Sequence, residues 1–413
     1  MGEGDRGAID EVLGQQVATA AVVHAALFPA RRLPGGVPGV AGAAGAGFVT
    51  AGEALRWAGA ERATLVASAA EALAAGLPRR AWELVIMLAS VQAAYFTLDD
   101  WAALSETGLA AAEAMGEAGP LAAALGHRGL LLARRGQLPA ARAMHARALA
   151  LGEAAGDLAA VAQARDGLGL VCLRLRELPE AEAHFAAAAR HARDLGDPFL
   201  AGVAGQHRAQ GWLAAGEAAR ALETLPSMAV SCAGVGEREY EGNARWLLAR
   251  ARRLSGDYPA ARGEIASALK VARAARLPGA EARWLAEAAR VHLAAGDAGE
   301  ALRCASSAAA LHRQAADSSG EAIALDCMGE ALLAAGSAEE AAVFHQQAAR
   351  THRDLADAWH QALALSHLGG CEAALGRASA SQEAATAALG LLGRFADPVA
   401  ARLAAGVAAS LGD

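Results

Sequence analysis

Apolar and small residues recur along this chain with a period of forty residues, and the most regular copy runs from Ser318 to Asp357. Apolar positions follow helical spacing over Glu321–Ala335 and again over Ala338–Leu355, which predicts two amphipathic helices. Gly336 lies between them, where a helix ends and a residue that tolerates a positive φ is favoured. Each copy is therefore predicted to be a pair of helices joined by a short turn.

The turn residues repeat with the same period. Glycine marks the middle turn at Gly136, Gly216, Gly256, Gly296, Gly336 and Gly376, and only Arg176 interrupts this series. An acidic residue ends the second helix at Asp157, Asp197, Glu237, Asp317, Asp357 and Asp397, with Leu277 as the exception. In Asp197-Pro198 and Asp397-Pro398 an N-cap residue is followed by proline at the first helical position, which is typical of a new helix.

Small residues identify the type of repeat. The first helix carries Gly129, Gly169, Ala209, Ala249, Ala289, Gly329 and Gly369 at one shared position. The second helix carries Ala141, Ala181, Ala221, Ala261, Ala301 and Ala341 near its start, and alanine again a heptad later in most copies. Small side chains at these places let neighbouring helices approach closely. The pattern resembles the tetratricopeptide family, here with helices longer than those of its usual unit.

The region before the repeats carries a second resemblance. Its residues are Ala54-Leu55-Arg56-Trp57, Glu61-Arg62-Ala63-Thr64-Leu65, Ala81-Trp82-Glu83-Leu84 and Asp100-Trp101. They resemble the junction in actinobacterial signal-transduction ATPases and antibiotic-pathway transcriptional regulators, where a winged-helix element passes into a C-terminal tetratricopeptide sensor region. The chain has no GxxxxGK[ST] motif and Lys270 is its only lysine. The resemblance thus implies a sensor region without ATP switching or DNA binding.

The predicted fold is all-α: a right-handed superhelical solenoid of tetratricopeptide-like helix pairs. We expect residues 1–52 to form an N-terminal capping helix and a Gly/Pro-rich connector at Leu33–Gly47, and residues 53–77 to form lead-in helices. About eight repeats are expected over 78–397, followed by a C-terminal capping helix over 398–413.

Composition and charge restrict the function. Hydrophobic residues make up 54% of the chain but aromatic residues only 4%, because much of the apolar content is alanine, a strong helix former. The net charge of −7 disfavours a surface that binds nucleic acid. The sequence has no membrane-spanning run or signal peptide, which predicts a cytoplasmic protein. Five scattered cysteines without a CxxC pair predict neither disulfides nor a structural zinc site.

Polar residues on the first helices of the middle repeats are the candidate site. They share the phase expected to face the concave groove: Gln206, Gln210, Asn243, Trp246, Arg250, Arg253, Arg283, Arg290, Asp326 and Glu330. Guanidinium groups beside an amide and an indole suit a carboxylate, a phosphate or an acidic peptide segment. The alternative is a solvated wall in which Arg290 pairs with Glu330 and Arg283 with Glu287.

The sequence offers little for catalysis or metal binding. No HExxH or GxSxG motif occurs. His345 and His352, and His360 and His367, are spaced by seven residues, about 10 Å along a helix, which is too far for one ion. His345 instead occupies a phase that other repeats fill with a large core side chain. We expect no metal, no cofactor and no catalytic residue, although a site composed from several helices stays open.

Three functions are compatible with these observations. The first is a non-enzymatic scaffold or sensor that grips a protein or peptide segment, acidic or with a free carboxylate, in its groove. The second is a sensor for a small molecule. The third is an enzyme or accessory factor of natural-product biosynthesis that uses Asp166, Asp326, Glu330 or a histidine in the groove as acid or base. Because no catalytic motif is present, the sequence favours the first function.

Overall fold

The computed structural model of the chain describes residues 3–27, 51–89, 97–234 and 237–410, and every regular element in these ranges is an α-helix. The expected connector at Leu33–Gly47 lies outside the described residues. The N-terminal helices are α1 (Glu3–Leu27), α2 (Ala51–Ala60), α3 (Arg62–Ala74), α4 (Pro78–Ala89) and α6 (Leu98–Met115). Helix α1 packs against α4, so the first turns of the stack are covered from the N-terminal end.

Helix pairs then follow one another to the C-terminal end. Their bounds are α7 (Ala118–Arg134) and α8 (Leu138–Ala155), α9 (Leu158–Leu175) and α10 (Leu178–Asp194), α11 (Pro198–Ala215) and α12 (Ala218–Gly234), α13 (Arg238–Leu254) and α14 (Tyr258–Ala275), α15 (Pro278–Ala294) and α16 (Ala298–Gln314), α17 (Ser318–Ala334) and α18 (Ala338–Asp354), and α19 (Ala358–Ala374) and α20 (Ala378–Leu392). Helix α21 (Pro398–Ala409) ends the described chain. The all-α repeat solenoid that the sequence predicts is confirmed.

The turn residues act as the sequence pattern predicts. Gly336 has φ +86°, the left-handed conformation that glycine adopts without a steric cost. Asp317 caps α17, because its Oδ1 accepts a hydrogen bond of 3.0 Å from the backbone N–H of Gly320. This cap places the start of α17 at Ser318, one turn earlier than the apolar pattern alone indicates.

The small positions on the first helices receive large side chains from the second helices. A Cβ atom at Gly169 would lie 2.5 Å from the ring of Phe185, and one at Gly329 would lie 2.6 Å from the ring of His345. Phe185 and His345 are both 0% exposed. His345 is therefore a packed core residue, as its phase in the repeat predicts.

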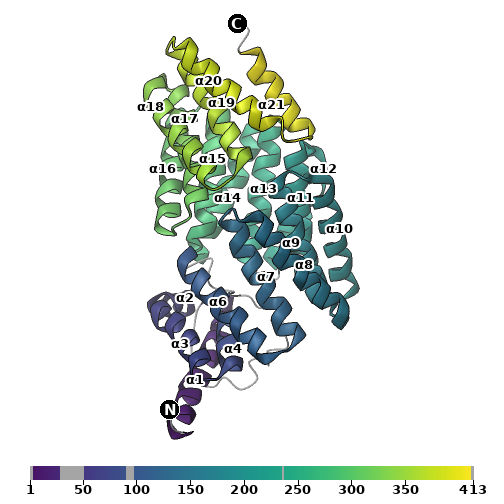
Figure 1. Cartoon of the computed structure of the whole chain (residues 1–413). Helices are drawn as coiled ribbons and strands as arrows, with labels where there is room; N and C mark the ends of the chain where they lie inside the picture. Colours follow the sequence, from purple (N-terminus) through teal and green to yellow (C-terminus); the bar gives the residue numbers. More distant parts are fainter. Residues whose placement is uncertain (1–2, 28–50, 90–96, 235–236, 411–413) are drawn as a thin grey trace.

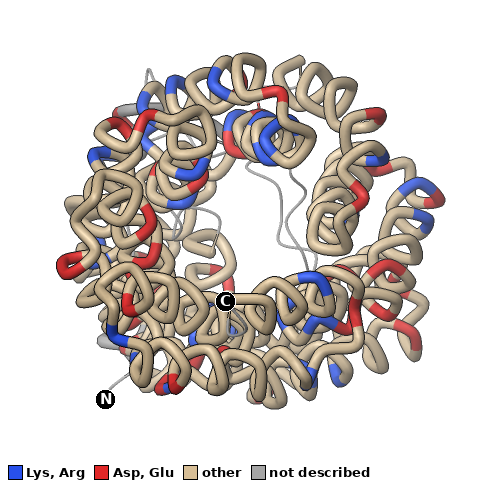
Figure 2. Tube along the Cα trace, turned by 90° about the horizontal axis from the view of Figure 1, so that it is seen from above, with Lys and Arg blue, Asp and Glu red and all other residues tan. Residues whose placement is uncertain are grey.

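The helix pairs curve into a ring with an inner and an outer layer of helices (Figure 2). First helices of successive repeats contact each other directly, as α13 does with α15 and α15 with α17. Second helices mainly contact the first helices before and after them, and they form the outer layer. No helix among the described residues combines the length and apolarity needed to cross a bilayer.

The ring continues past one full turn, so that later repeats lie against earlier ones (Figure 1). We call this contact the turn-to-turn seam, and it consists of arginines near the ends of α7 and α9 paired with the N-cap aspartates of α17, α19 and α21. The pairs are Arg134–Asp317 at 2.8 Å, Arg174–Asp357 at 3.2 Å and Arg176–Asp397 at 2.6 Å. Backbone atoms join it as well, because the N–H of Leu98 donates to the carbonyl of Ala315 at 3.3 Å.

Arg176, which interrupts the glycine series, has a specific place in this seam. Its backbone has φ +59°, and both side chains of the Arg176–Asp397 pair are only 6% exposed. The guanidinium donates through Nε and Nη2 to the two carboxylate oxygens of Asp397, at 2.7 and 2.6 Å, and lies 3.6 Å from the ring centre of Trp359. Glycine could not make these contacts, so the exception in the repeat is a clamp between two turns.

Candidate functional site

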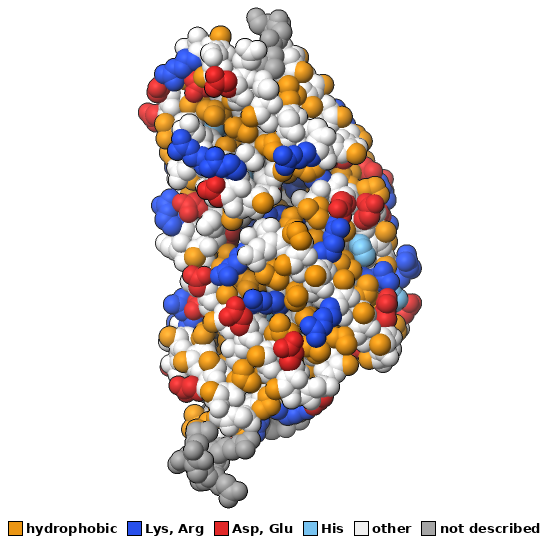
Figure 3. Space-filling model, in the orientation of Figure 1, with side chains coloured by type: hydrophobic (Ala, Val, Ile, Leu, Met, Phe, Trp, Pro, Cys, Tyr) orange, Lys and Arg blue, Asp and Glu red, His pale blue; other side chains and the backbone are white. Residues whose placement is uncertain are grey.

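Helices α11, α13, α15 and α17 carry the polar residues singled out from the sequence. We call the surface formed by those of them that are not buried the inner face. Acidic and basic positions lie on helices around the middle of the ring (Figure 2). On the outer surface that Figure 3 presents, side chains of both signs are interspersed, and no single sign covers that view. The inner face therefore has to be judged pair by pair.

Two of its arginines are neutralised by glutamates. The Nε of Arg253 donates to Glu287 at 2.6 Å, and Glu287 is only 3% exposed. Arg283, with a side chain 29% exposed, lies 3.5 Å from Glu239. The sequence-based alternative paired Arg283 with Glu287, which is wrong, because Arg253 from α13 takes that carboxylate.

The other two arginines have no such partner. Arg250 and Arg290 are half-buried, and neither makes an ion pair or a side-chain hydrogen bond within the described part of the chain. Arg290 and Glu330 therefore do not form the ion pair that the sequence-based alternative predicted. Burial lowers the pKa of Arg250 to about 10; Glu287 opposes this effect, while the charges of Arg253 and Arg290 add to it. Arg250 and Arg290 thus keep guanidinium groups available to a ligand.

Neutral polar groups flank these arginines, and two of them already have partners. Gln206 is 2% exposed and its amide donates to the carbonyl of Tyr240 at 2.8 Å, so the expectation that it faces the groove is wrong. Asn243 is half-buried and accepts from Nε1 of Trp284 at 3.2 Å. Gln210 is half-buried and makes no side-chain hydrogen bond among the described residues.

The indole of Trp246 is only partly available. Trp246 packs against both apolar clusters that adjoin α13, and its Nε1 is buried without a hydrogen-bond partner in the described chain. Trp246, Gln210 and Arg250 are each half-buried, so the adjacent helices α11 and α13 present both polar and aromatic groups. Such a surface suits both the charged and the flat parts of a peptide.

Acidic and imidazole groups lie beside the arginines. Asp326 is 5% exposed and its Oδ1 receives Nδ1 of His345 at 2.7 Å and Nδ1 of His367 at 3.1 Å. Burial opposes the charging of His367, but Asp326 raises its pKa to about 9. Glu330 lies 3.9 Å from His367 Nε2. The charges of Cys327, Glu330, Glu287 and Asp326 also raise the pKa of Arg290, so its guanidinium is compensated at a distance although it forms no ion pair in the described chain. Arg250, whose pKa is lowered, is the least compensated charge of the inner face.

Comparisons with known proteins show which solved structures share the fold of this chain. No protein-family profile and no curated protein match the chain. The Rap protein complexed with Competence and Sporulation Factor matches with a TM-score of 0.51 at 12% identity, over 78% of this chain and 99% of that one. A signal-transduction ATPase with numerous domains and a tetratricopeptide-repeat sensor, from Pyrococcus horikoshii, matches with a TM-score of 0.50 at 14% identity, over 81% of this chain and 50% of that one.

The fold is a tetratricopeptide-repeat solenoid. It resembles the sensor region of such a signal-transduction ATPase, as the sequence indicates. In this solenoid the inner face belongs to the first helices, which is why residues forty apart on α13 and α15, such as Arg250 and Arg290, lie on the same surface.

Sequence reasoning missed the clusters that histidines form between helices. Asp326 brings together His345 and His367, and His352 stacks on His360, with 5.1 Å between ring centres, beside Asp357. Spacing along one helix could not find them, because the partners come from different helices. A signal exists in the repeat itself: Asp166 and His207 are 41 residues apart, as are Asp326 and His367, and both pairs are bonded.

Proposed function

We propose that this solenoid is a binding module that holds a peptide or protein segment with carboxylate groups against its inner face. The observation that carries the proposal is the pair of guanidinium groups without a protein partner, Arg250 and Arg290, on adjacent inner helices. An unpaired half-buried charge costs stability, so its presence favours a role outside the folded chain itself.

The chemistry of the surroundings supports a carboxylate ligand. Guanidinium groups bind carboxylates through two parallel hydrogen bonds, and Gln210, on the neighbouring helix α11, offers a donor and an acceptor to a peptide backbone. The Rap protein, a neighbour in fold, was captured with Competence and Sporulation Factor bound. A regulatory role for this chain is part of the same proposal.

A peptide selection tests the proposal. A library of short random peptides is presented to the wild-type chain, and the selected peptides are measured by calorimetry against the double variant Arg250→Gln/Arg290→Gln. We expect acidic peptides or free C-terminal carboxylates to be selected, and the double variant to lose about 100-fold or more in affinity, because two charge-assisted contacts vanish.

The matched control is Arg190→Gln, which removes an exposed arginine of α10 that has no ion pair within the described chain. Its affinity should equal that of the wild type. Equal affinity of the wild type and the double variant, or selection of peptides without acidic groups, would argue against the inner face as the binding site.

A further inference from the structure

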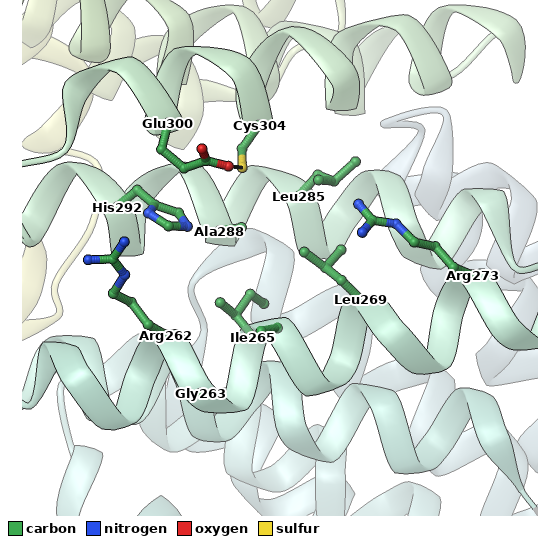
Figure 4. A pocket seen from close by; sticks show the side chains of 11 residues that line it. Arg262, Gly263, Ile265, Leu269, Arg273, Leu285, Ala288, His292, Glu300 and Cys304 are labelled. Atoms are coloured by element: carbon green, nitrogen blue, oxygen red, sulfur yellow. Dashed lines mark hydrogen bonds between the residues drawn. The ribbon is translucent and has the colours of Figure 1, made fainter.

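A cavity of about 480 Å³ lies on the outer side of the solenoid, between α14, α15 and α16 (Figure 4). Its floor is apolar and includes Ile265, Leu269 and Leu285, while Arg262 and Arg273 extend from α14 at its two ends. Helices α14 and α15 contact each other less closely than α12 and α13 or α16 and α17 do. The cavity thus lies where two consecutive helices of the solenoid pack less closely against each other.

Three different metal-binding side chains meet at one end of this cavity. His292 comes from α15, and Glu300 and Cys304 lie one turn apart on α16, so that both point toward α15 (Figure 4). One donor atom from each residue lies within 4.8 Å of the other two. Imidazole, carboxylate and thiolate together are a donor set that suits zinc.

One spacing in this cluster matches that of two ligands on a tetrahedral ion. Sulfur and oxygen ligands on tetrahedral zinc are about 3.6 Å apart, given the usual bond lengths. Cys304 Sγ and Glu300 Oε1 are 3.7 Å apart, a distance at which the thiol can donate a hydrogen bond to the carboxylate when no ion is bound. In the cluster around Asp326, Nδ1 of His345 and Nδ1 of His367 lie 2.7 and 3.1 Å from Oδ1, which are ordinary hydrogen-bond distances.

Nearby carboxylates pair with the arginines whose positive charges would otherwise repel a bound cation. Arg303 binds Glu300 through Oε2, which holds the carboxylate and leaves Oε1 toward Cys304. Arg262 lies 3.4 Å from Oδ2 of Asp297. Burial lowers the pKa of His292, and the charge of Arg262 adds to this effect, while Asp297 opposes it.

We propose that His292, Glu300 and Cys304 form a zinc-binding site whose fourth coordination position faces the cavity. Binding replaces the Cys304 thiol proton, which passes to solvent, by a bond from the thiolate to the ion. The ion then links α15 to α16, and the open position is available to water. This site is separate from the inner face.

Cobalt(II) titration of the full chain under reducing conditions tests the site. Co²⁺ substitutes for Zn²⁺ in such sites, and a bound thiolate gives a sulfur-to-cobalt charge-transfer band in the near ultraviolet. We expect this band to grow to one equivalent and to disappear when Zn²⁺ is added. Cys304→Ser should abolish the band, and Glu300→Gln should weaken cobalt affinity by about tenfold or more.

The control is Cys172→Ser, which removes a buried thiol beside Arg142 and Glu177 and should leave the band intact. The helical signal in circular dichroism checks that each variant is folded. If Cys304→Ser does not fold, Glu300→Gln takes its place in the test. Cobalt binding without a charge-transfer band, or a band that survives in both Cys304→Ser and Glu300→Gln, would overturn the proposal.

Discussion

Arginines occur both in the turn-to-turn seam and on the inner face, but the two regions use them differently. In the seam, Arg134, Arg174 and Arg176 each have an aspartate partner whose side chain is 6 or 7% exposed. On the inner face, Arg250 and Arg290 have none within the described chain. The difference indicates that the seam arginines hold the fold together, whereas the ones without an ion pair are those that we propose bind a ligand.

The largest effect is expected for Arg176→Ala. The change leaves the buried Asp397 carboxylate without its two hydrogen bonds from Arg176, and removal of one partner of a buried ion pair costs about 3 to 5 kcal/mol. Chemical denaturation should show this loss in the free energy of unfolding, and amides of α21 should exchange faster. Arg190→Ala, on the exposed side of α10, should stay within about 0.5 kcal/mol of the wild type. Equal behaviour of the two variants would show that the seam contributes nothing to stability.

Gly136→Ala probes the backbone side of the seam. Gly136 has φ +76°, and a Cβ there would lie 2.6 Å from the carbonyl oxygen of Leu355. Gly256 has φ +80° but open space around it, so Gly256→Ala should cost only the conformational penalty of about 1 to 2 kcal/mol. Gly136→Ala should cost about 1 to 3 kcal/mol more, by overpacking. If thermal unfolding gives the same loss for both, the two turns do not touch in solution.

Acid should weaken the seam through its aspartates. Burial alone would raise the pKa of Asp317, but the hydrogen bond from His312 and the charge of Arg134 lower it below the ordinary 3.8. A depressed pKa contributes stability that is present above about pH 4 and is lost as the pH falls toward the folded-state pKa. The free energy of unfolding should therefore fall in this range by about 2 kcal/mol for this residue.

The same reasoning applies to Asp357, where burial is outweighed by His360 and Arg174. Asp317→Asn should flatten the acid limb of a plot of melting temperature against pH. An unchanged acid limb in Asp317→Asn would mean that this residue does not titrate with folding.

The smallest effect, of opposite sign, is expected for Arg250→Gln. It removes a half-buried charge near Arg253 and Arg290. The free energy of unfolding should therefore stay constant or increase by up to about 1 kcal/mol, and the melting temperature should stay constant or rise with it. Differential scanning calorimetry checks this result. A loss comparable to that of Arg176→Ala would place Arg250 among the structural arginines.

The repeat was readable because its helix ends depend on local residues. Gly336 and Asp317 set the bounds of α17 and α18 through backbone conformation and capping, both of which a short stretch of sequence determines. The positions of Arg250 and Arg290 on an inner helix followed from phase. Phase did not distinguish Gln206, which is buried, from Gln210, which is half-buried, because depth depends on the packing of neighbouring helices.

The seam and the cluster at His292 could not be predicted in the same way. Arg134 and Asp317 are 183 residues apart, and their contact depends on the curvature that all the intervening helix pairs add together. The cluster at His292 forms only because α15 packs against α16, which carries Glu300 and Cys304. A spacing rule for a single helix does not describe how two helices pack.

The most direct test is the melting temperature of the wild type and of Arg250→Gln/Arg290→Gln, each with and without a saturating peptide from the selection. We expect the free variant to melt at or above the wild type, and the peptide at about 100 times its Kd to stabilise only the wild type, by about 2.7 kcal/mol. A free variant that melts well below the wild type, and that the peptide still stabilises equally, would mean that these arginines serve the fold and not a ligand.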